Sequence, residues 1–321
     1  MKIKSLTLLF ATFAIVETLF AWDYENVKLN NLYYNLDAST KTAEVTYSGT
    51  DYDNLKTVTL PESVEYNSVT YIVTSIGDCA FQTCFDLKSV TIPNSVTSIG
   101  EDAFWDCHAL PEIILPNSIT SIGARAFYRC KALTSVNIPN GITEIEERVF
   151  ESCKNLTSIE IPNNVTSIGW AAFRAAGLTS VEIPNSVTEI GSDAFSCANV
   201  TSLIIGSGVT YIGDGAFKSC EALESITCKA IVPPTKGGSI FSSEIKSNSI
   251  PLYVPAESIE AYKAEPEWKM FMVFPISESP TAVFGTEAST QSEDFVKFLH
   301  NGQLLIHREG KTYNVQGAEV K

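Results

Sequence analysis

The segment IGEDAFWDCHALPEIILPNSITS, residues 99–121, is followed directly by IGARAFYRCKALTSVNIPNGITE, residues 122–144. The two segments align without a gap, and units of the same form run from Ile76 to Cys228. Their phenylalanines are spaced by 23, 23, 23, 23, 22 and 22 residues: Phe81, Phe104, Phe127, Phe150, Phe173, Phe195 and Phe217. A fixed period of this size is typical of solenoid proteins, in which each unit forms one turn of a coil.

Each unit predicts its own local structure. The stretch Leu-x-x-Val-x-Ile-Pro alternates apolar and polar positions, which predicts a strand with one buried face that ends at the Pro-Asn turn. A second short strand follows at Val-Thr-Ser-Ile. The stretch Ala-Phe-x-x-Cys-x-x-Leu predicts a short helical or 3₁₀ turn. One unit buries too little apolar surface to offset the entropy of ordering it, so equivalent strands must stack in parallel, about 4.8 Å apart.

The repeat pattern L-x-x-[VI]-x-I-P-x-x-[VI]-x-x-I-G-x-x-A-F-x-x-C, over about residues 55–228, resembles the BspA-like class of bacterial leucine-rich repeats. The resemblance implies a β-rich repeat solenoid, with about seven units of 22 or 23 residues at 76–228. It also implies an adhesin-like role at a bacterial surface, directed at host matrix proteins or at other bacteria.

The first 21 residues have the order of a secretory signal peptide: Lys2 and Lys4, an apolar run from Leu6 to Val16, and a small residue at Ala21. The apolar run is about 11 residues long, whereas a membrane-spanning helix needs about 20. No later segment approaches that length. We therefore expect an exported chain without a transmembrane segment.

The segments outside the repeats differ in composition. Residues 22–75 predict β-strands that cap the first repeat, and residues 229–276 predict a C-terminal cap with a short helix beginning at Ser258. Residues 277–293 are rich in Ser, Thr and Glu and predict a linker. Residues 294–321 predict a small β tail. This tail resembles C-terminal segments of exported proteins from anaerobic Gram-negative bacteria, which implies a sorting segment and a Gram-negative source.

Charge and composition exclude several functions. The chain has 22 Lys and Arg against 37 Asp and Glu, a net charge of -15, which argues against a nucleic-acid partner. The three histidines, His108, His300 and His307, have no second ligand-type residue three or four positions away. No hydrolase, metalloprotease or phosphate-binding motif is present. We expect no catalytic residue, no bound metal and no cofactor.

Six of the eight cysteines occupy one repeat position: Cys84, Cys107, Cys130, Cys153, Cys197 and Cys220. Counting back from the following strand places Ala175 at this position in the fifth unit. The first interpretation is a ladder of buried, reduced thiols that pack as small apolar groups. The second is that some of them form disulfides, and Cys79 lies close enough in sequence to pair with Cys84. A metal or catalytic role is disfavoured, because one thiol per turn does not converge on a point.

The outward positions of the first strand form rows along the coil, and solenoids use such faces for extended binding. The candidate binding residues are Thr91, Glu112, Asn137, Thr157, Thr179, Glu160 and Glu182. Ser and Thr on this face are also simply soluble β-residues. Glu160 and Glu182 are different, because like charges on neighbouring strands cost stability. We interpret this pair as part of a site for a basic or cation-bearing partner.

The sequence therefore favours an exported cell-surface or secreted binding protein that contacts a protein or a glycan through its solenoid sheet face. The expected partner is a host matrix protein or another bacterial surface. Two alternatives remain. One is a structural surface scaffold without a specific ligand, and the other is an accessory binding module of a polysaccharide-processing system whose catalysis lies elsewhere.

Overall fold

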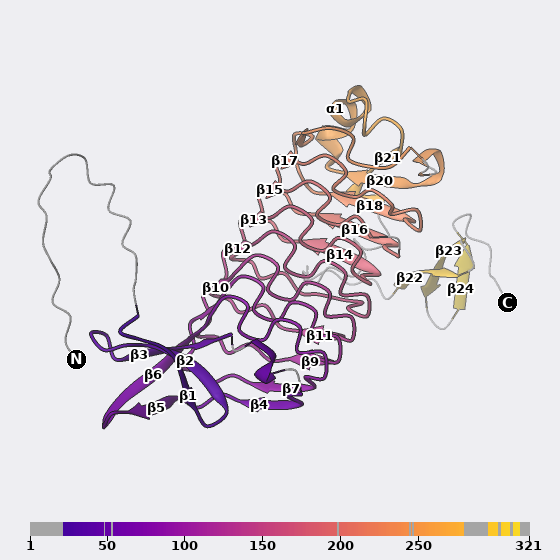
Figure 1. Cartoon of the computed structure of the whole chain (residues 1–321). Coiled ribbons are helices and arrows are strands. Elements are labelled where there is room, and N and C mark those ends of the chain that lie inside the picture. Colours follow the sequence, from indigo (N-terminus) through magenta and orange to yellow (C-terminus); the bar gives the residue numbers. More distant parts are fainter. Residues whose placement is uncertain are drawn as a thin grey trace, which may run out of the picture.

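The computed structural model describes most of the chain from Trp22 to Glu278, together with the backbone of three strands near the C-terminus. The described residues are 22–47, 49–52, 54–197, 199–243, 245, 247–278, 295–300, 303–308 and 311–314. The predicted signal peptide and most of the predicted linker lie outside them. The repeats stack into one elongated β-solenoid (Figure 1).

The second strand of each repeat pairs in parallel with its equivalents. One sheet begins in the N-terminal segment, in the order β1-β2-β3-β6-β8-β10, with β5 on β6. Its strands are β1 (Tyr24–Leu29), β2 (Leu32–Asp37), β3 (Thr42–Thr46), β5 (Ser63–Tyr66), β6 (Val69–Ile76), β8 (Ser98–Ile99) and β10 (Ser121–Ile122). A second sheet continues the same side: β12 (Glu144–Ile145), β13 (Ser167–Ile168), β15 (Glu189–Ile190), β17 (Tyr211–Ile212) and β19 (Thr235–Lys236).

The first strands of the repeats form three separate groups. Equivalent residues pair in parallel, as in Glu182 with Ile204 and Ile204 with Thr227, so the predicted stacking of whole units is confirmed. The groups are β4 (Thr57–Thr59) with β7 (Ser89–Thr91), β9 (Glu112–Ile113) with β11 (Ser135–Val136), and β14 (Ser180–Ile183), β16 (Ser202–Ile205), β18 (Ser225–Cys228), β20 (Pro251–Val254) and β21 (Met272–Pro275).

The stretch Ala-Phe-x-x-Cys is not the helical or 3₁₀ turn that the sequence predicts. In the first unit Cys79 and Thr83 have φ of 57° and 60°, in the left-handed region that interrupts a right-handed helix. The N–H groups of Cys79, Phe81 and Thr83 instead donate to carbonyl oxygens of the next unit, at 2.8, 2.8 and 2.7 Å. Equivalent bonds continue as far as Ile240. The turns therefore form a third hydrogen-bonded ladder, which we call the turn ladder.

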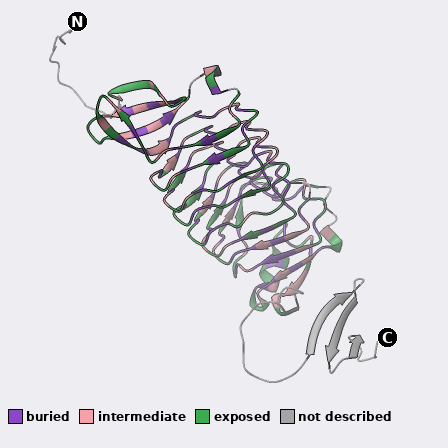
Figure 2. Ribbon diagram, turned by 90° about the horizontal axis from the view of Figure 1, so that it is seen from below, coloured by how far each residue is buried: buried purple, intermediate pink, exposed green. Residues whose placement is uncertain are grey.

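The core is a column of aromatic rings inside the coil. The seven repeat phenylalanines stack with ring centroids 5.0 to 5.7 Å apart. Tyr52 continues the column at the N-terminal end at 5.5 Å, and Phe241 continues it at the other end at 5.9 Å. Buried residues line the interior of every turn and exposed residues cover the outside (Figure 2).

The repeat cysteines lie beside this column. All six are buried, and five of their thiols donate to the carbonyl oxygen of a core phenylalanine in an earlier turn, at 2.8 to 3.3 Å: Cys107, Cys130, Cys153, Cys197 and Cys220. The predicted placement of Ala175 is wrong, because Ala175 is exposed with a φ of 54° and Ala176 takes the buried position. The fifth unit is one residue shorter than the first four, and the missing residue lies after the thiol position. Counting back from the following strand assumed that it lies before that position. Cys79 is a free thiol, so it has no bond to Cys84.

The C-terminal segment completes the last turns. Strand β19 pairs with β17, and Phe241 forms a parallel bridge with Phe217. Three short helical elements follow: η2 (Ser247–Ser249) before β20, and then η3 (Ala256–Ser258) with the predicted helix, α1 (Ile259–Ala264). Two further 3₁₀ elements, η1 (Gly49–Tyr52) and η4 (Ile276–Glu278), lie near the two ends of the solenoid. The tail forms an antiparallel sheet of β22 (Phe295–His300), β23 (Gln303–Arg308) and β24 (Lys311–Asn314).

Candidate functional site

The first-strand ladder is interrupted at the fourth unit. The N–H of Thr179 donates to the carbonyl oxygen of Thr157 at 3.0 Å, but the next four residues, Ser158–Ile161, make no backbone hydrogen bond to either neighbouring unit among the described residues. Strand β11 therefore pairs only with β9, and β14 only with β16. This interruption coincides with the change of period from 23 to 22 residues.

A groove of about 450 Å³ opens at the interruption, and we call it the sheet groove. It lies over the ends of the first strands of the fourth and fifth units. Its lining is mostly polar and includes both glutamates of the predicted pair: Ile159, Glu160, Ile161, Asn163, Ser180, Glu182, Ile183, Pro184, Asn185 and Lys229. The structure thus brings Glu160 and Glu182 to one concave surface.

Both glutamates are exposed, and neither forms an ion pair with another described residue. Two unpaired carboxylates on neighbouring turns repel each other, a cost that a bound cation would relieve. Lys229 is the only cationic side chain in the lining, and it directly follows the seventh unit. The groove can therefore accept a positively charged group between the two carboxylates.

Of the three threonine candidates, Thr179 has a structural role. The hydroxyl of Thr179 donates to the carbonyl oxygen of Thr157 at 3.3 Å, and the hydroxyl of Thr201 donates to that of Thr179 at 3.1 Å. The second strands repeat this pattern, for example from Thr188 to Thr166 at 3.1 Å. These side chains stabilise the contact between turns, which leaves their methyl groups as the main feature presented to a partner.

Asn137 is also engaged within the solenoid. Its amide nitrogen donates to the carbonyl oxygen of Leu115 at 2.7 Å, and its side-chain oxygen accepts from the N–H of Leu115 at 2.8 Å. The side chain thereby replaces a backbone pair beyond the end of β9. Thr91 in β7 and Glu112 in β9 are exposed but lie outside the sheet groove. Of the seven candidates, only Glu160 and Glu182 line one site.

The pattern that defines the BspA type leucine rich repeat region matches six copies in the chain, over residues 74–197 and 144–263. Together these stretches make up more than half of the chain. The chain belongs to the BspA-type leucine-rich repeat family. No functionally curated protein matches this BspA-type chain.

Solved structures of bacterial leucine-rich repeat proteins are similar to the BspA-type chain. One from Bacteroides ovatus is 25% identical, with 71% of each chain covered and a TM-score of 0.51, in agreement with the repeat fold. A leucine rich cell surface protein from Faecalibacterium prausnitzii is 22% identical, over 83% of this chain and 98% of that one, with a TM-score of 0.45. A leucine-rich repeat protein of T. pallidum is 24% identical, over 76% and 93%, with a TM-score of 0.43.

Sequence reasoning on this BspA-type chain missed Asn163, Asn185 and Lys229. The two asparagines belong to the Pro-Asn turn that recurs in the first five units, so they looked like turn residues only. The side-chain oxygen of Asn185 accepts from the N–H of Ser207 at 2.9 Å, which holds one wall of the groove. Lys229 follows the last repeat and gives no periodic signal. Aligning Lys229 with Pro184 would have placed both residues at the same end of their first strands.

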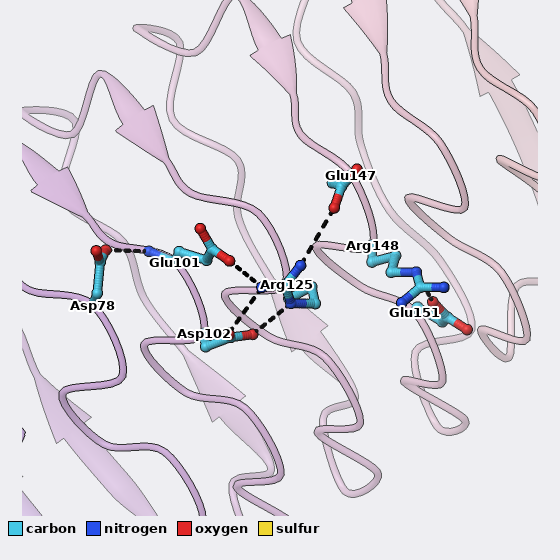
Figure 3. Close-up of polar contacts among 7 residues, drawn as sticks. All are labelled: Asp78, Glu101, Asp102, Arg125, Glu147, Arg148 and Glu151. Atoms are coloured by element: carbon cyan, nitrogen blue, oxygen red, sulfur yellow. Dashed lines mark hydrogen bonds and ion pairs between the residues drawn. The ribbon is translucent and has the colours of Figure 1, made fainter.

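A second charged cluster lies on the turns of the BspA-type solenoid (Figure 3). Arg125 contacts Glu101, Asp102 and Glu147, so one guanidinium joins three consecutive units. Its hydrogen bond with Asp102 is the main cause that raises the pKa of Arg125. Because its members satisfy one another, this cluster supports the stacking of units.

Arg148 and Glu151 form a smaller pair beside that cluster (Figure 3). Burial raises the pKa of the Glu151 carboxyl above its ordinary value, while Arg148 and Arg174 oppose that shift. Arg148 also lies over the ring of Trp170, 4.0 Å from its centroid. These contacts hold the side chains of Arg148, Glu151 and Trp170 in place on neighbouring turns.

Neither cluster forms a metal centre. Within residues that the structure describes, no group of three or more His, Cys, Asp or Glu side chains could hold a metal ion. His108 binds Asp106 at 2.8 Å, and the side chains of His300 and His307 lie outside the described residues. In the same part of the chain, no helix has the length and apolar composition needed to span a bilayer.

Proposed function

We propose that this BspA-type chain is an exported binding protein that acts at a bacterial cell surface or after secretion. Its partner is a protein or glycan that carries a basic or cationic group and docks on the sheet face. The observation that carries the proposal is the convergence of Glu160 and Glu182 in one groove. Membership of a repeat family whose members are typically non-catalytic binding modules supports it.

The geometry supports binding through charge and shape together. The solenoid fixes the backbone of both glutamates on neighbouring turns, so only their side chains have to be ordered when a cation is bound between them. Lys229 in the same lining disfavours a partner with cations throughout its contact surface, which contributes to specificity. The outward Ser and Thr residues around the groove give a soluble, polar rim, as in ordinary protein interfaces.

The test measures binding of the purified chain to an array of matrix proteins and glycans. Saturable binding to a few members is expected. Glu160→Gln combined with Glu182→Gln should weaken that binding by about tenfold at low salt, since two charge-assisted contacts are lost. Glu112→Gln is the matched control, because Glu112 is an outward glutamate outside the groove. Equal binding by the double variant and the control would contradict the proposal.

The same experiment separates the other functions. Absence of any saturable binding, together with ordered self-assembly of the chain, would favour a structural surface scaffold. Binding of the purified chain that is confined to polysaccharides would favour an accessory module of a polysaccharide-processing system. Export is tested separately by N-terminal sequencing, for which Trp22 is the expected first residue of the mature chain, and surface location by protease treatment of intact cells.

A further inference from the structure

The structure holds a second groove of about 450 Å³, at the other end of the same first strands, and its charge is opposite. We call it the turn groove. It is lined by Lys154, Arg174, Ala175, Ala176, Gly177, Ser196, Asn199 and Ser219. The lining contains two cations and no carboxylate, in a chain whose net charge is -15. The chain's overall composition does not explain this local reversal.

The shortened repeats create the turn groove. The fifth unit has one residue, Gly177, between Ala176 and Leu178, where the first unit has two residues between Cys84 and Leu87. A Cβ atom on Gly177 would collide with the carbonyl oxygen of Lys154, so glycine allows this turn to lie tightly against the fourth unit. The groove is therefore a local depression between turns of ordinary length.

The two cations are available to a ligand. Lys154 is exposed and forms no ion pair with any described residue. Arg174 reaches the buried Glu151 only at 3.9 Å, and 45% of its side chain remains exposed. Glu151 already pairs with Arg148 at 3.2 Å, so its charge is shared. Lys131 occupies the repeat position of Lys154 one turn earlier, which extends the positive surface.

The remaining lining favours a sugar over a peptide. Ser196, Ser219 and Asn199 offer hydroxyl and amide groups, which match the hydroxyls of a saccharide. No aromatic or large aliphatic side chain lines the groove, whereas protein interfaces take most of their affinity from such anchors. We propose that the turn groove binds an acidic saccharide, with the sugar carboxylate between Lys154 and Arg174. This site is separate from the sheet groove and does not depend on its function.

The test measures the affinity of the full chain for oligogalacturonate by calorimetry, with methyl-esterified oligogalacturonate and poly-glutamate as comparison probes. Saturable binding to the acidic sugar is expected, with at least about tenfold weaker binding to the ester, because the ester removes the charge-assisted contacts. Lys154→Gln should weaken binding by about tenfold, and addition of Arg174→Gln should weaken it further. Lys56→Gln with Lys88→Gln is the matched control, since it removes two exposed lysines from the N-terminal turns.

Lys154→Gln removes no ion pair, so a change in its affinity will not reflect misfolding, and its thermal unfolding should match that of the unmodified chain. Three results would overturn the proposal: no binding of oligogalacturonate, equal affinity for the acid and its ester, or equal affinity of Lys154→Gln and the control. Tighter binding of poly-glutamate than of oligogalacturonate would also overturn it, and would assign the groove to an acidic protein segment. The sheet-groove variant Glu160→Gln with Glu182→Gln should bind oligogalacturonate normally.

Discussion

Arg125 binds Asp102 of the preceding unit with two nitrogens, Nε at 2.8 Å and Nη2 at 3.1 Å. Asp102 is 7% exposed, so its carboxylate has little access to water. Fork-shaped contacts of this kind are among the strongest ion pairs in proteins. Since the same guanidinium also reaches Glu147 in the following unit, at 3.3 Å, it ties three turns together.

Arg125→Met should lower the free energy of unfolding by about 2 to 4 kcal/mol, because it leaves the buried Asp102 without a cation. Chemical unfolding in urea measures the change. Lys88→Met is the control: Lys88 is exposed and makes no ion pair with a described residue, so a change within about 0.5 kcal/mol is expected. Equal effects of the two substitutions would show that the Arg125 cluster does not stabilise the stack.

Phe127→Ala should lower the free energy of unfolding by about 3 to 5 kcal/mol, more than Arg125→Met does. The Phe127 ring lies between Phe104 at 5.4 Å and Phe150 at 5.6 Å, and a cavity there removes packing on both sides. Phe85→Ala serves as the control, because Phe85 is 50% exposed. If thermal unfolding shifted equally for both, the aromatic column would not be the principal core of the solenoid.

The thiol ladder predicts a loss of stability at alkaline pH. Burial raises the pKa of Cys153 and Cys197 to about 12 and that of Cys220 to about 11, from an ordinary value of 9.0. The unfolded chain therefore releases these protons first. The contribution of the thiols is complete below about pH 9 and is lost as the pH rises towards 12. At about pH 10 the ionisation of each thiol in the unfolded chain should lower the free energy of unfolding by about 1.4 kcal/mol.

Urea unfolding between about pH 8 and about pH 10 measures the slope of the free energy of unfolding against pH. Changing Cys153, Cys197 and Cys220 together to alanine should lower stability at both pH values but flatten the dependence on pH. Burial also raises the pKa of Cys107 and Cys130 well above the ordinary value and that of Tyr34 to about 12, so a smaller slope should remain in the variant. An unchanged slope would mean that the thiols do not ionise on unfolding.

Glu267 holds the last turn of the solenoid through three contacts. Its carboxylate accepts from the N–H groups of Ile240 at 2.8 Å and Phe241 at 3.2 Å, and from the ammonium of Lys236 at 2.9 Å. Glu267→Ala should speed hydrogen exchange at Ile240 and Phe241 by about tenfold or more, since both amides lose their acceptor. Glu260→Ala, on the exposed side of α1, should leave both rates unchanged.

Much of the fold follows from the period. Seven phenylalanines at nearly constant spacing require a stack of equivalent turns, and the alternation around each isoleucine identifies the buried face of the strand. Tyr52 and Phe241 occupy the same column but lie 29 and 24 residues from their neighbours, Phe81 and Phe217. Because their spacing departs from the repeat, no periodic search includes them. Their role depends on the path of the chain between turns.

The candidate site was predictable only in part. Adjacent glutamates in one outward row identified Glu160 and Glu182. The interrupted ladder that forms the sheet groove arises from Ser158–Ile161, whose sequence matches the paired strands of other units. The left-handed turn residues were also hidden, because Cys79, Asp102 and Arg125 share a conformation but not a residue type. Hydrogen bonds between turns impose that conformation, which intrinsic propensity disfavours.

The direction of the turn ladder determines how the protein responds to a pulling force. Its hydrogen bonds run from each unit to the next, along the axis of the coil, and each turn contacts only its neighbours. Tension applied at the two ends therefore opens one layer of bonds at a time instead of shearing all of them together. Each released turn adds about 75 Å of extended chain. A solenoid built in this way lengthens in even steps under load while the turns that remain stacked keep their grooves intact.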